Sequence, residues 1–302
     1  MSFFDRAIAA TLPLVPSPIV RKVASRYVAG EELAEALETV KRLNAEGASA
    51  TLDVLGEDVT NRSETDFFVE EYKRALSEIS AQNLDSNVSV KLSAMGLRFD
   101  PALALENFRR IAVEAKRRGN FVRIDMEDSA LTQATIDLFR SAREEFDNIG
   151  IVLQAYLRRT QRDVADAISE RWSVRICKGI YAEPPALAFR DADLIRRNYA
   201  YVTDRMLAAR VPLGIATHDE AMVLEALHSL ERHGSPHESY EFQMLMGVSP
   251  SLRRLLLGQG HRLRVYVPYG KSWKGYSLRR LKENPAIARH ILKATLKGEG
   301  TL

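Results

Sequence analysis

The residues best suited to chemistry lie near the end of the chain, in residues 262–285, RLRVYVPYGKSWKGYSLRRLKENP. The first six alternate polar and apolar side chains and include two valines, which predicts a strand. Pro268 and Gly270 predict a turn after that strand. A helix is expected from about Gly275 up to Pro285, because proline disfavours α geometry in the residue before it.

The predicted helix would carry Tyr276, Arg279, Arg280 and Glu283 at spacings of three and four, so these side chains share one side. Two adjacent arginines with an acid and an aromatic ring suggest a site for a small carboxylate. The same pattern also fits a solvated amphipathic helix on which Arg280 and Glu283 form only a surface pair. This stretch alone leaves both interpretations open.

The elements that must position these residues repeat along the chain. Alternating or continuous apolar runs predict strands at residues 48–58, 87–96, 121–128, 150–157, 173–181, 212–220, 239–247 and 262–267. Amphipathic patterns predict intervening helices at residues 65–79, 101–119, 131–146, 160–171, 191–210, 221–234 and 250–260.

Eight strand–helix units predict a distorted (β/α)8 barrel, an α/β fold of about 250 residues. We expect an N-terminal helical arm at residues 1–47 and the barrel, with a C-terminal helix, at residues 48–302. A doubly wound sheet is the alternative, but it would call for a GxGxxG fingerprint after an early strand, and the sequence has none.

A barrel places its active site at the carboxyl ends of the strands. Nearly every predicted strand ends in polar or charged residues: Asp53, Glu57, Lys91, Asp125, Glu127, Asp128, Gln154, Tyr156, Arg175, Lys178, Tyr181, Thr217, His218, Asp219, Gln243, Tyr266 and Tyr269. Charges are seldom buried without partners, so a ring of them predicts a functional cavity. Glu127, Asp128 and Asp219 fit loop or helix N-cap positions equally well.

Composition excludes several classes of function. A net charge of +3 across 302 residues does not indicate a nucleic-acid partner. The single cysteine, Cys177, cannot form an internal disulfide and fits a reducing compartment. No run of eighteen apolar residues predicts a membrane span. We therefore expect a cytoplasmic protein.

Three kinds of site remain open on the residues alone. Many cations without a metal-ligand cluster suit an anionic ligand or cofactor together with a carboxylate substrate. Lys91 or Lys178 would suit a Schiff-base lyase or aldolase-type barrel enzyme, although Asp125 on the adjacent strand would keep Lys91 charged. A carboxylate-binding module without catalysis is the third possibility.

Motifs at most strand ends carry a resemblance to a known family. They are SVKLSAMG (89–96), IDMED (124–128), LQAY (153–156), RICKGIY (175–181), ATHDE (216–220), YEFQMLMG (240–247) and the stretch 262–285. Together, from about residue 50 to 290, they resemble the monofunctional bacterial proline dehydrogenases, flavoenzymes with a distorted (β/α)8 barrel.

The resemblance implies oxidation of L-proline to Δ1-pyrroline-5-carboxylate, the first step of proline catabolism. Arg279, Arg280 and Lys91 would bind the substrate carboxylate, and Asp125 and Glu283 would hold those cations in place. The walls around the substrate ring are implied to be Tyr181, Leu245, Tyr266 and Tyr276. Tyr266 would lie where a ring hydroxyl projects, so proline is expected to be preferred over 4-hydroxyproline.

The same resemblance implies FAD, held by Gln154, Arg175, Lys178, Gly179, Thr217 and His218. Glu64 matches a glutamate that closes the mouth in some members, and it would pair with Arg279. Ile180 and Cys177 depart from the usual alanine and valine. Ile180 would crowd the pocket, whereas Cys177 is expected to be a small buried apolar residue.

The implied partners are L-proline, a membrane quinone that accepts the electrons, and a pyrroline-5-carboxylate dehydrogenase acting downstream. Residues 287–297 are basic and amphipathic, which is typical either of an ordinary packed helix or of one lying on an anionic membrane surface. We expect a cytoplasmic enzyme in peripheral contact with the inner face of the cell membrane.

Overall fold

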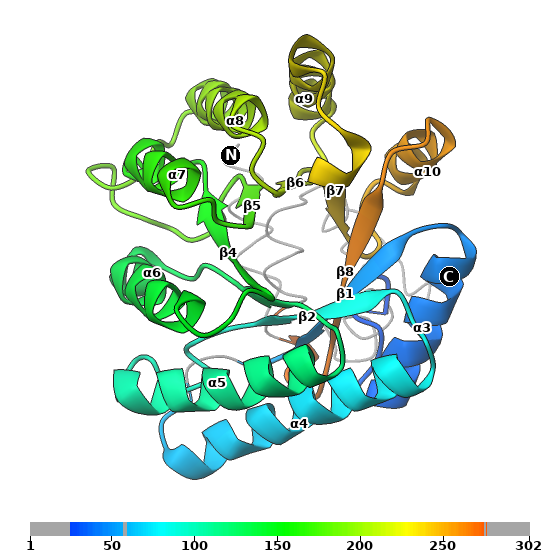
Figure 1. The fold of residues 1–302 in the computed structure, drawn as a ribbon, viewed down its shortest axis with the longest axis vertical. Coiled ribbons are helices and arrows are strands. Elements are labelled where there is room, and N and C mark those ends of the chain that lie inside the picture. Colours follow the sequence, from blue (N-terminus) through cyan, green and yellow to red (C-terminus); the bar gives the residue numbers. More distant parts are fainter. Residues whose placement is uncertain (1–24, 57–58, 275, 277–302) are drawn as a thin grey trace, which may run out of the picture.

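The computed structural model describes residues 25–56, 59–274 and 276. Their eight strands pair in parallel in chain order, and β8 closes onto β1, so the predicted (β/α)8 barrel is confirmed. The strands are β1 (Ser49–Val54), β2 (Ser86–Val90), β3 (Val122–Ile124), β4 (Ile149–Gln154), β5 (Val174–Cys177), β6 (Leu213–Ala216), β7 (Tyr240–Leu245) and β8 (Leu263–Tyr269). Figure 1 shows them gathered at the centre of the molecule.

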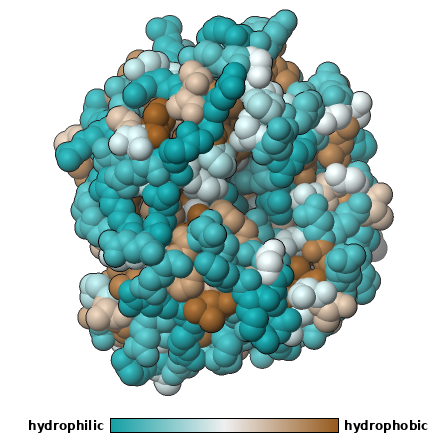
Figure 2. All heavy atoms as spheres, in the orientation of Figure 1, coloured by the Kyte–Doolittle hydropathy of each residue, from teal (hydrophilic) through white to brown (hydrophobic). Residues whose placement is uncertain are grey.

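Helices surround the strands on the outside (Figure 1). They are α3 (Leu33–Ala45), α4 (Arg62–Ala81), α5 (Pro101–Arg117), α6 (Ser129–Arg143), α7 (Thr160–Ser169), α8 (Ala192–Ala208), α9 (Glu220–His233) and α10 (Pro250–Gly258), with a short 3-10 helix, η2 (His237–Ser239), before β7. Hydrophilic side chains cover most of the face shown in Figure 2. None of the helices in the described ranges is both long and apolar enough to cross a membrane.

Local signals explain where the helices begin and end. Asn61 caps α4 by accepting a hydrogen bond from the Glu64 backbone N–H at 3.0 Å. Asp100 caps α5, whose first residue is Pro101, and Gly234 ends α9 in the left-handed conformation. These caps fix where α4 and α5 begin and where α9 ends.

The main core lies between the barrel and the helices. Trp172, Tyr199, Phe108 and Phe139 are fully buried there, and Phe139 meets Trp172 edge to face at 5.2 Å between ring centroids. The helix α3 contacts β1 and β8, which ties residues before the first strand to the seam of the barrel. Residues 1–24 of the predicted arm lie outside the described residues, as do residues 287–297.

The inside of the barrel is unusually polar. Such interiors are commonly filled by branched apolar side chains, yet alternate residues of these strands include Thr51, Asn87, Ser89 and Arg123, hydrogen-bonded within the barrel. Gly150 gives Arg123 room, since a Cβ at Gly150 would lie 2.2 Å from its Nη1. Polar side chains therefore extend inward from the mouth of the barrel.

Candidate active site

A cavity of about 810 Å³ opens where the predicted ring of strand ends lies. Its lining includes Lys91, Asp125, Arg175, Lys178, Gly179, Tyr181, Thr217, His218, Gln243, Leu245, Tyr266 and Tyr276. A cavity of this size is typical of sites for cofactors and small molecules. The strand ends thus converge on one concave site.

Lys91 follows β2 and is held by two carboxylates. Its Nζ lies 2.6 Å from Oδ1 of Asp53 and 3.9 Å from Oδ2 of Asp125. The side chain of Asp53 is fully buried, and the parallel register sets Asp53 of β1 beside Ser89, two residues before Lys91. Because strand side chains alternate, Ser89 and Lys91 face the same interior. Breaking such a buried pair typically costs about 3–5 kcal/mol.

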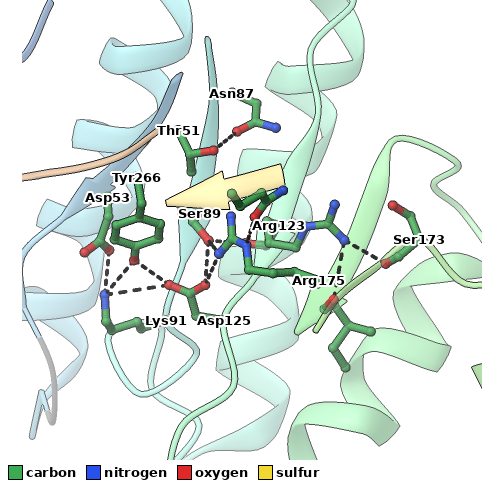
Figure 3. A network of polar contacts seen from close by, with 12 residues as sticks. Thr51, Asp53, Asn87, Ser89, Lys91, Arg123, Asp125, Ser173, Arg175 and Tyr266 are labelled. Carbon is green, nitrogen blue, oxygen red and sulfur yellow. Dashed lines mark hydrogen bonds and ion pairs between the residues drawn. The ribbon is translucent and has the colours of Figure 1, made fainter. Parts of the chain in front are cut away.

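Asp125, directly after β3, is the centre of a larger network (Figure 3). Its Oδ1 accepts hydrogen bonds from Arg175 Nη1 at 2.9 Å and from Ser89 Oγ at 2.7 Å. Its Oδ2 accepts the Tyr266 hydroxyl at 2.6 Å. The Arg175 guanidinium lies 5.3 Å from the centre of the Tyr266 ring. One carboxylate therefore fixes a cation and an aromatic wall of the cavity.

Burial changes the titration of this network. Loss of solvent raises the pKa of Asp53, partly opposed by the positive charge of Lys91. Burial, followed by the charges of Asp125 and Asp53, raises the pKa of the Tyr266 phenol well above its usual value. Tyr266 is therefore a hydroxyl donor at neutral pH.

A second group of cavity residues comes from the ends of β5 and β6. Lys178 is exposed at the cavity and makes no ion pair with any residue in the described ranges. Gly179 has φ +103°, and a Cβ there would lie 2.0 Å from the ring of Tyr156. Only glycine fits that conformation and that space. The loop can therefore pack closely against Tyr156 at the cavity wall.

His218 and Thr217 lie beside this wall. The Leu245 backbone N–H donates to His218 Nε2 at 2.7 Å, so in neutral His218 the proton is on Nδ1. The Asp219 backbone N–H donates to Thr217 Oγ1 at 3.1 Å. The β5–β6 wall thus carries an exposed cation, a glycine turn and an oriented imidazole.

The family model described as proline dehydrogenase matches residues 36–292, most of the chain. The chain belongs to the proline dehydrogenase family.

Individual members of the proline dehydrogenase family agree along nearly the whole length. The chain is 38% identical over 274 residues to proline dehydrogenase 1 of Bacillus subtilis subsp. natto and 35% identical over 281 residues to proline dehydrogenase of Deinococcus radiodurans. Each alignment covers 91% of both proteins. The predicted resemblance, from about residue 50 to 290, is confirmed.

A solved structure shares the fold. Proline utilization A from Bdellovibrio bacteriovorus aligns with a TM-score of 0.82 at 23% identity, covering 87% of this chain and 33% of that one. This proline dehydrogenase family chain therefore spans about a third of that solved protein.

Two residues predicted for the proline dehydrogenase site lie away from the cavity lining. Gln154 is buried, and its Nε2 donates to the Glu127 carbonyl oxygen at 2.7 Å. Glu64 is exposed in the first turn of α4, where its Oε2 accepts the Thr60 backbone N–H at 3.0 Å. In this structure Gln154 links the end of β4 to the segment after β3, and Glu64 binds the backbone just before α4.

The predicted carboxylate clamp cannot be placed. Arg279, Arg280 and Glu283 lie outside the described residues, so the pairing of Glu64 with Arg279 stays a prediction. Tyr276 is described; it is buried, lines the cavity and packs in a small cluster with Tyr27.

The sequence pattern assigns no role to Asp53, which lies nearer to Lys91 than Asp125 does. It marks Asp53 and Gln243 only as strand ends and gives Ser89 no function. The available signal was strand alternation, since Ser89 is two residues before Lys91 and shares its face. Which carboxylate lies nearer to Lys91 depends on register and side-chain rotamers, which the sequence does not specify.

Proposed function

We propose that this protein oxidises L-proline to Δ1-pyrroline-5-carboxylate with FAD as the hydride acceptor. The observation that carries the proposal is the cavity network of Lys91, Asp125, Arg175 and Tyr266 at the mouth of a proline dehydrogenase family barrel. Lys91 would bind the substrate carboxylate together with Arg279 and Arg280. Bidentate guanidinium groups fix the orientation of a carboxylate as well as binding it.

Rigid walls support this role. Tyr266 is tied to Asp125, and Leu245 is tied through its N–H to His218. With Tyr181 and Tyr276 they would hold the ring carbon next to the nitrogen toward the hydride acceptor, and hydride transfer depends on such positioning. Nearby cations favour loss of the proton from the substrate amine, so no strong general base is needed.

The described residues fit a flavin on the β5–β6 side. Lys178 offers an exposed cation for a phosphate, and Gly179 lines the same wall, where its lack of a Cβ lets the loop pack against Tyr156. Thr217 and His218 flank the same wall, and Arg175 would lie near the ring system, where a cation favours a reduced anionic state. Bound FAD would supply the two-electron acceptor. We infer that Gln154 contributes to the flavin site indirectly, by holding the backbone at Glu127, to whose carbonyl oxygen it donates.

A Schiff-base lyase is less well supported. A nucleophilic lysine needs desolvation or neighbouring cations to lose its proton. Lys91 instead has Asp53 at 2.6 Å and Asp125 at 3.9 Å, and two carboxylates favour the charged ammonium.

The wider setting follows from the reaction. The electrons would pass to a membrane quinone, and a pyrroline-5-carboxylate dehydrogenase would consume the product. We propose a cytoplasmic location with peripheral membrane contact, through which the enzyme reaches the quinone.

Absorption spectroscopy of the purified protein tests the proposal. A flavin band should be present or appear on addition of FAD, and L-proline should bleach it in the absence of NAD. A lyase would stay colourless and be trapped on Lys91 or Lys178 by borohydride with a keto substrate. A carboxylate-binding module would bind proline without turnover. A colourless protein that takes up no flavin overturns the proposal.

A further inference from the structure

Two side chains of β7 form a hydrogen-bonded line inside the barrel, between Arg175 and Arg264, both of which line the cavity. Gln243 lines the cavity, and its Oε1 accepts a hydrogen bond from Nε of Arg175. Its Nε2 donates to Oε1 of Glu241 at 2.6 Å. Glu241 precedes Gln243 by two residues, so both point into the barrel from the same side of the strand.

Glu241 is anchored at the amino-terminal part of the barrel. Arg264, near the start of β8, donates through Nε to Glu241 Oε1 at 2.7 Å and through Nη1 to the Ala50 carbonyl at 2.7 Å. Burial alone would raise the pKa of Glu241, but the charge and hydrogen bond of Arg264 outweigh it and hold that pKa below its usual value. Glu241 is therefore an ionised, acceptor-only group.

That charge selects one orientation of the Gln243 amide. An ionised carboxylate must face the amide NH2, which leaves the amide oxygen for the Arg175 N–H. Gly214 leaves room for this amide beside β6, since a Cβ there would lie 2.5 Å from Gln243 Nε2.

We propose that Glu241 and Gln243 are positioning residues that hold the Arg175 guanidinium against Asp125 and toward the cofactor side of the cavity. What Arg175 does there rests on the proposed function; the hydrogen-bonded line does not. In Glu241→Gln the amide at position 241 can turn its NH2 toward Gln243 while its oxygen accepts from Arg264, and Gln243 can then present its own NH2 to the Arg175 N–H. Arg175 would then lose its fixed direction.

The first test measures hydrogen exchange at the Arg175 Nε–H by 15N–1H spectroscopy on the protein as purified. The signal is assigned by its loss in Arg175→Lys. A charge-assisted hydrogen bond is worth about 1.5–3 kcal/mol, so its exchange should be at least about tenfold faster in E241Q than in wild type. The control is E114Q: Glu114 pairs with Arg117 and Arg118 at the end of α5, away from the barrel interior, and its side chain is about as exposed as that of Glu241.

A double variant tests for rescue. In E241Q/Q243E, the carboxylate now at position 243 would accept from Arg175. The amide now at position 241 would donate to that carboxylate while accepting from Arg264. The double variant again has one carboxylate and one amide, with their positions exchanged. Slow exchange at the Arg175 Nε–H should therefore return in the double variant. If E241Q exchanged faster only because the whole protein was less stable, the second substitution would not restore slow exchange.

The second test follows the bound flavin. Because Arg175 would favour the reduced anionic cofactor, its loss of position in E241Q should lower the midpoint potential. We expect a shift of about tenfold in the two-electron equilibrium, or about 30 mV. E114Q should match wild type.

The outcomes separate the two proposals. A wild type that takes up no FAD overturns the proposed function, and the exchange measurement still decides this inference. Equal Arg175 exchange in wild type and E241Q overturns the inference, as does faster exchange that the double variant fails to restore. An unchanged potential in E241Q overturns its extension to the cofactor.

Discussion

At the scale of single residues, Asp53 is the group on which Lys91 depends most directly. It is fully buried and lies 2.6 Å from the ammonium, whereas Asp125 lies at 3.9 Å and also binds Arg175 and Tyr266. The two carboxylates thus have different roles: Asp53 holds Lys91, and Asp125 positions Arg175 and Tyr266.

Replacing Asp53 with asparagine should destabilise the protein and weaken substrate binding. The amide of D53N keeps the shape but gives Lys91 only a neutral partner, so we expect a loss of about 1–3 kcal/mol in the free energy of unfolding. Urea unfolding measures it, and KM for proline should rise more than kcat falls. As control, D147N changes an exposed acid 3.2 Å from Lys116 and should stay within about 0.5 kcal/mol of wild type. Equal stability of D53N and D147N would contradict this role.

Tyr266 should make the enzyme prefer proline over 4-hydroxyproline. Its hydroxyl is bound to Asp125 and its ring lies over Arg175, so this wall cannot move aside for an extra hydroxyl. We expect kcat/KM to favour proline at least about tenfold. In Y266F the ring loses its hydrogen bond to Asp125, so the ratio of kcat/KM for proline to that for 4-hydroxyproline should fall.

The control is Y269F, which removes a buried hydroxyl of the same strand that bonds Glu71. This variant should leave the ratio unchanged. Comparable kcat/KM values for the two substrates in wild type would refute the prediction.

At the scale of elements, the loop after β5 has the strictest backbone requirement in the site. Gly179 combines φ +103° with a Tyr156 ring that occupies the place of a Cβ. Gly119 also has a positive φ, +63°, but nothing lies within 4 Å of its Cβ position. Substitutions at these two glycines therefore distinguish backbone strain, which both share, from steric crowding, which only Gly179 has.

Gly179→Ala should therefore impair flavin retention more than Gly119→Ala. Both changes strain the backbone at a cost of order 1 kcal/mol or more, but only G179A must push the loop or Tyr156 out of place. Flavin content per protein after dialysis measures the difference, with urea unfolding as a check on stability. Equal flavin content in G179A and G119A would show that the loop need not approach the cofactor.

Periodicity explains why the elements could be predicted from the sequence. The predicted helix 191–210 corresponds to α8 at Ala192–Ala208, and Lys91 and Asp125 directly follow their strands as expected. The convergence of the strand ends then follows from parallel pairing. The barrel interior was not predicted, because polar residues such as Gln243 at alternate positions also fit a strand with one solvated face. The amide of Gln154 likewise turns to Glu127, a choice set by packing.

At the scale of the whole molecule, charged side chains are spread along the barrel interior, from the mouth toward the amino-terminal ends of the strands. Among the described interior residues, the cations Lys91, Arg175 and Arg264 pair with the carboxylates Asp53, Asp125 and Glu241, and a fourth cation, Arg123, donates to the Ser173 carbonyl oxygen. Burial and the nearby charge of Arg175 lower the pKa of Arg123 to about 9. An excess of positive charge suits an anionic ligand at the mouth, and it makes each carboxylate important for stability.

This balance predicts how stability depends on pH. The pKa of Glu241 is lower in the folded protein than in the unfolded chain, where it is about 4.3. The unfolded state therefore binds the proton more tightly, and the stability that ionised Glu241 contributes is present above that pH and lost as the pH falls through the folded pKa. Glu241→Gln should destabilise the protein by about 1–3 kcal/mol at pH 7.

The difference in unfolding free energy between wild type and E241Q should shrink below about pH 4, because protonated Glu241 no longer balances Arg264. Urea unfolding of both proteins across about pH 3–7 measures it. E106Q alters an exposed acid on α5 and should match wild type within about 0.5 kcal/mol throughout. A difference that stays constant with pH would mean that Glu241 supports the barrel by shape alone. A difference that shrinks on acidification would show that the negative charge of Glu241 stabilises the neighbouring cations of the barrel interior.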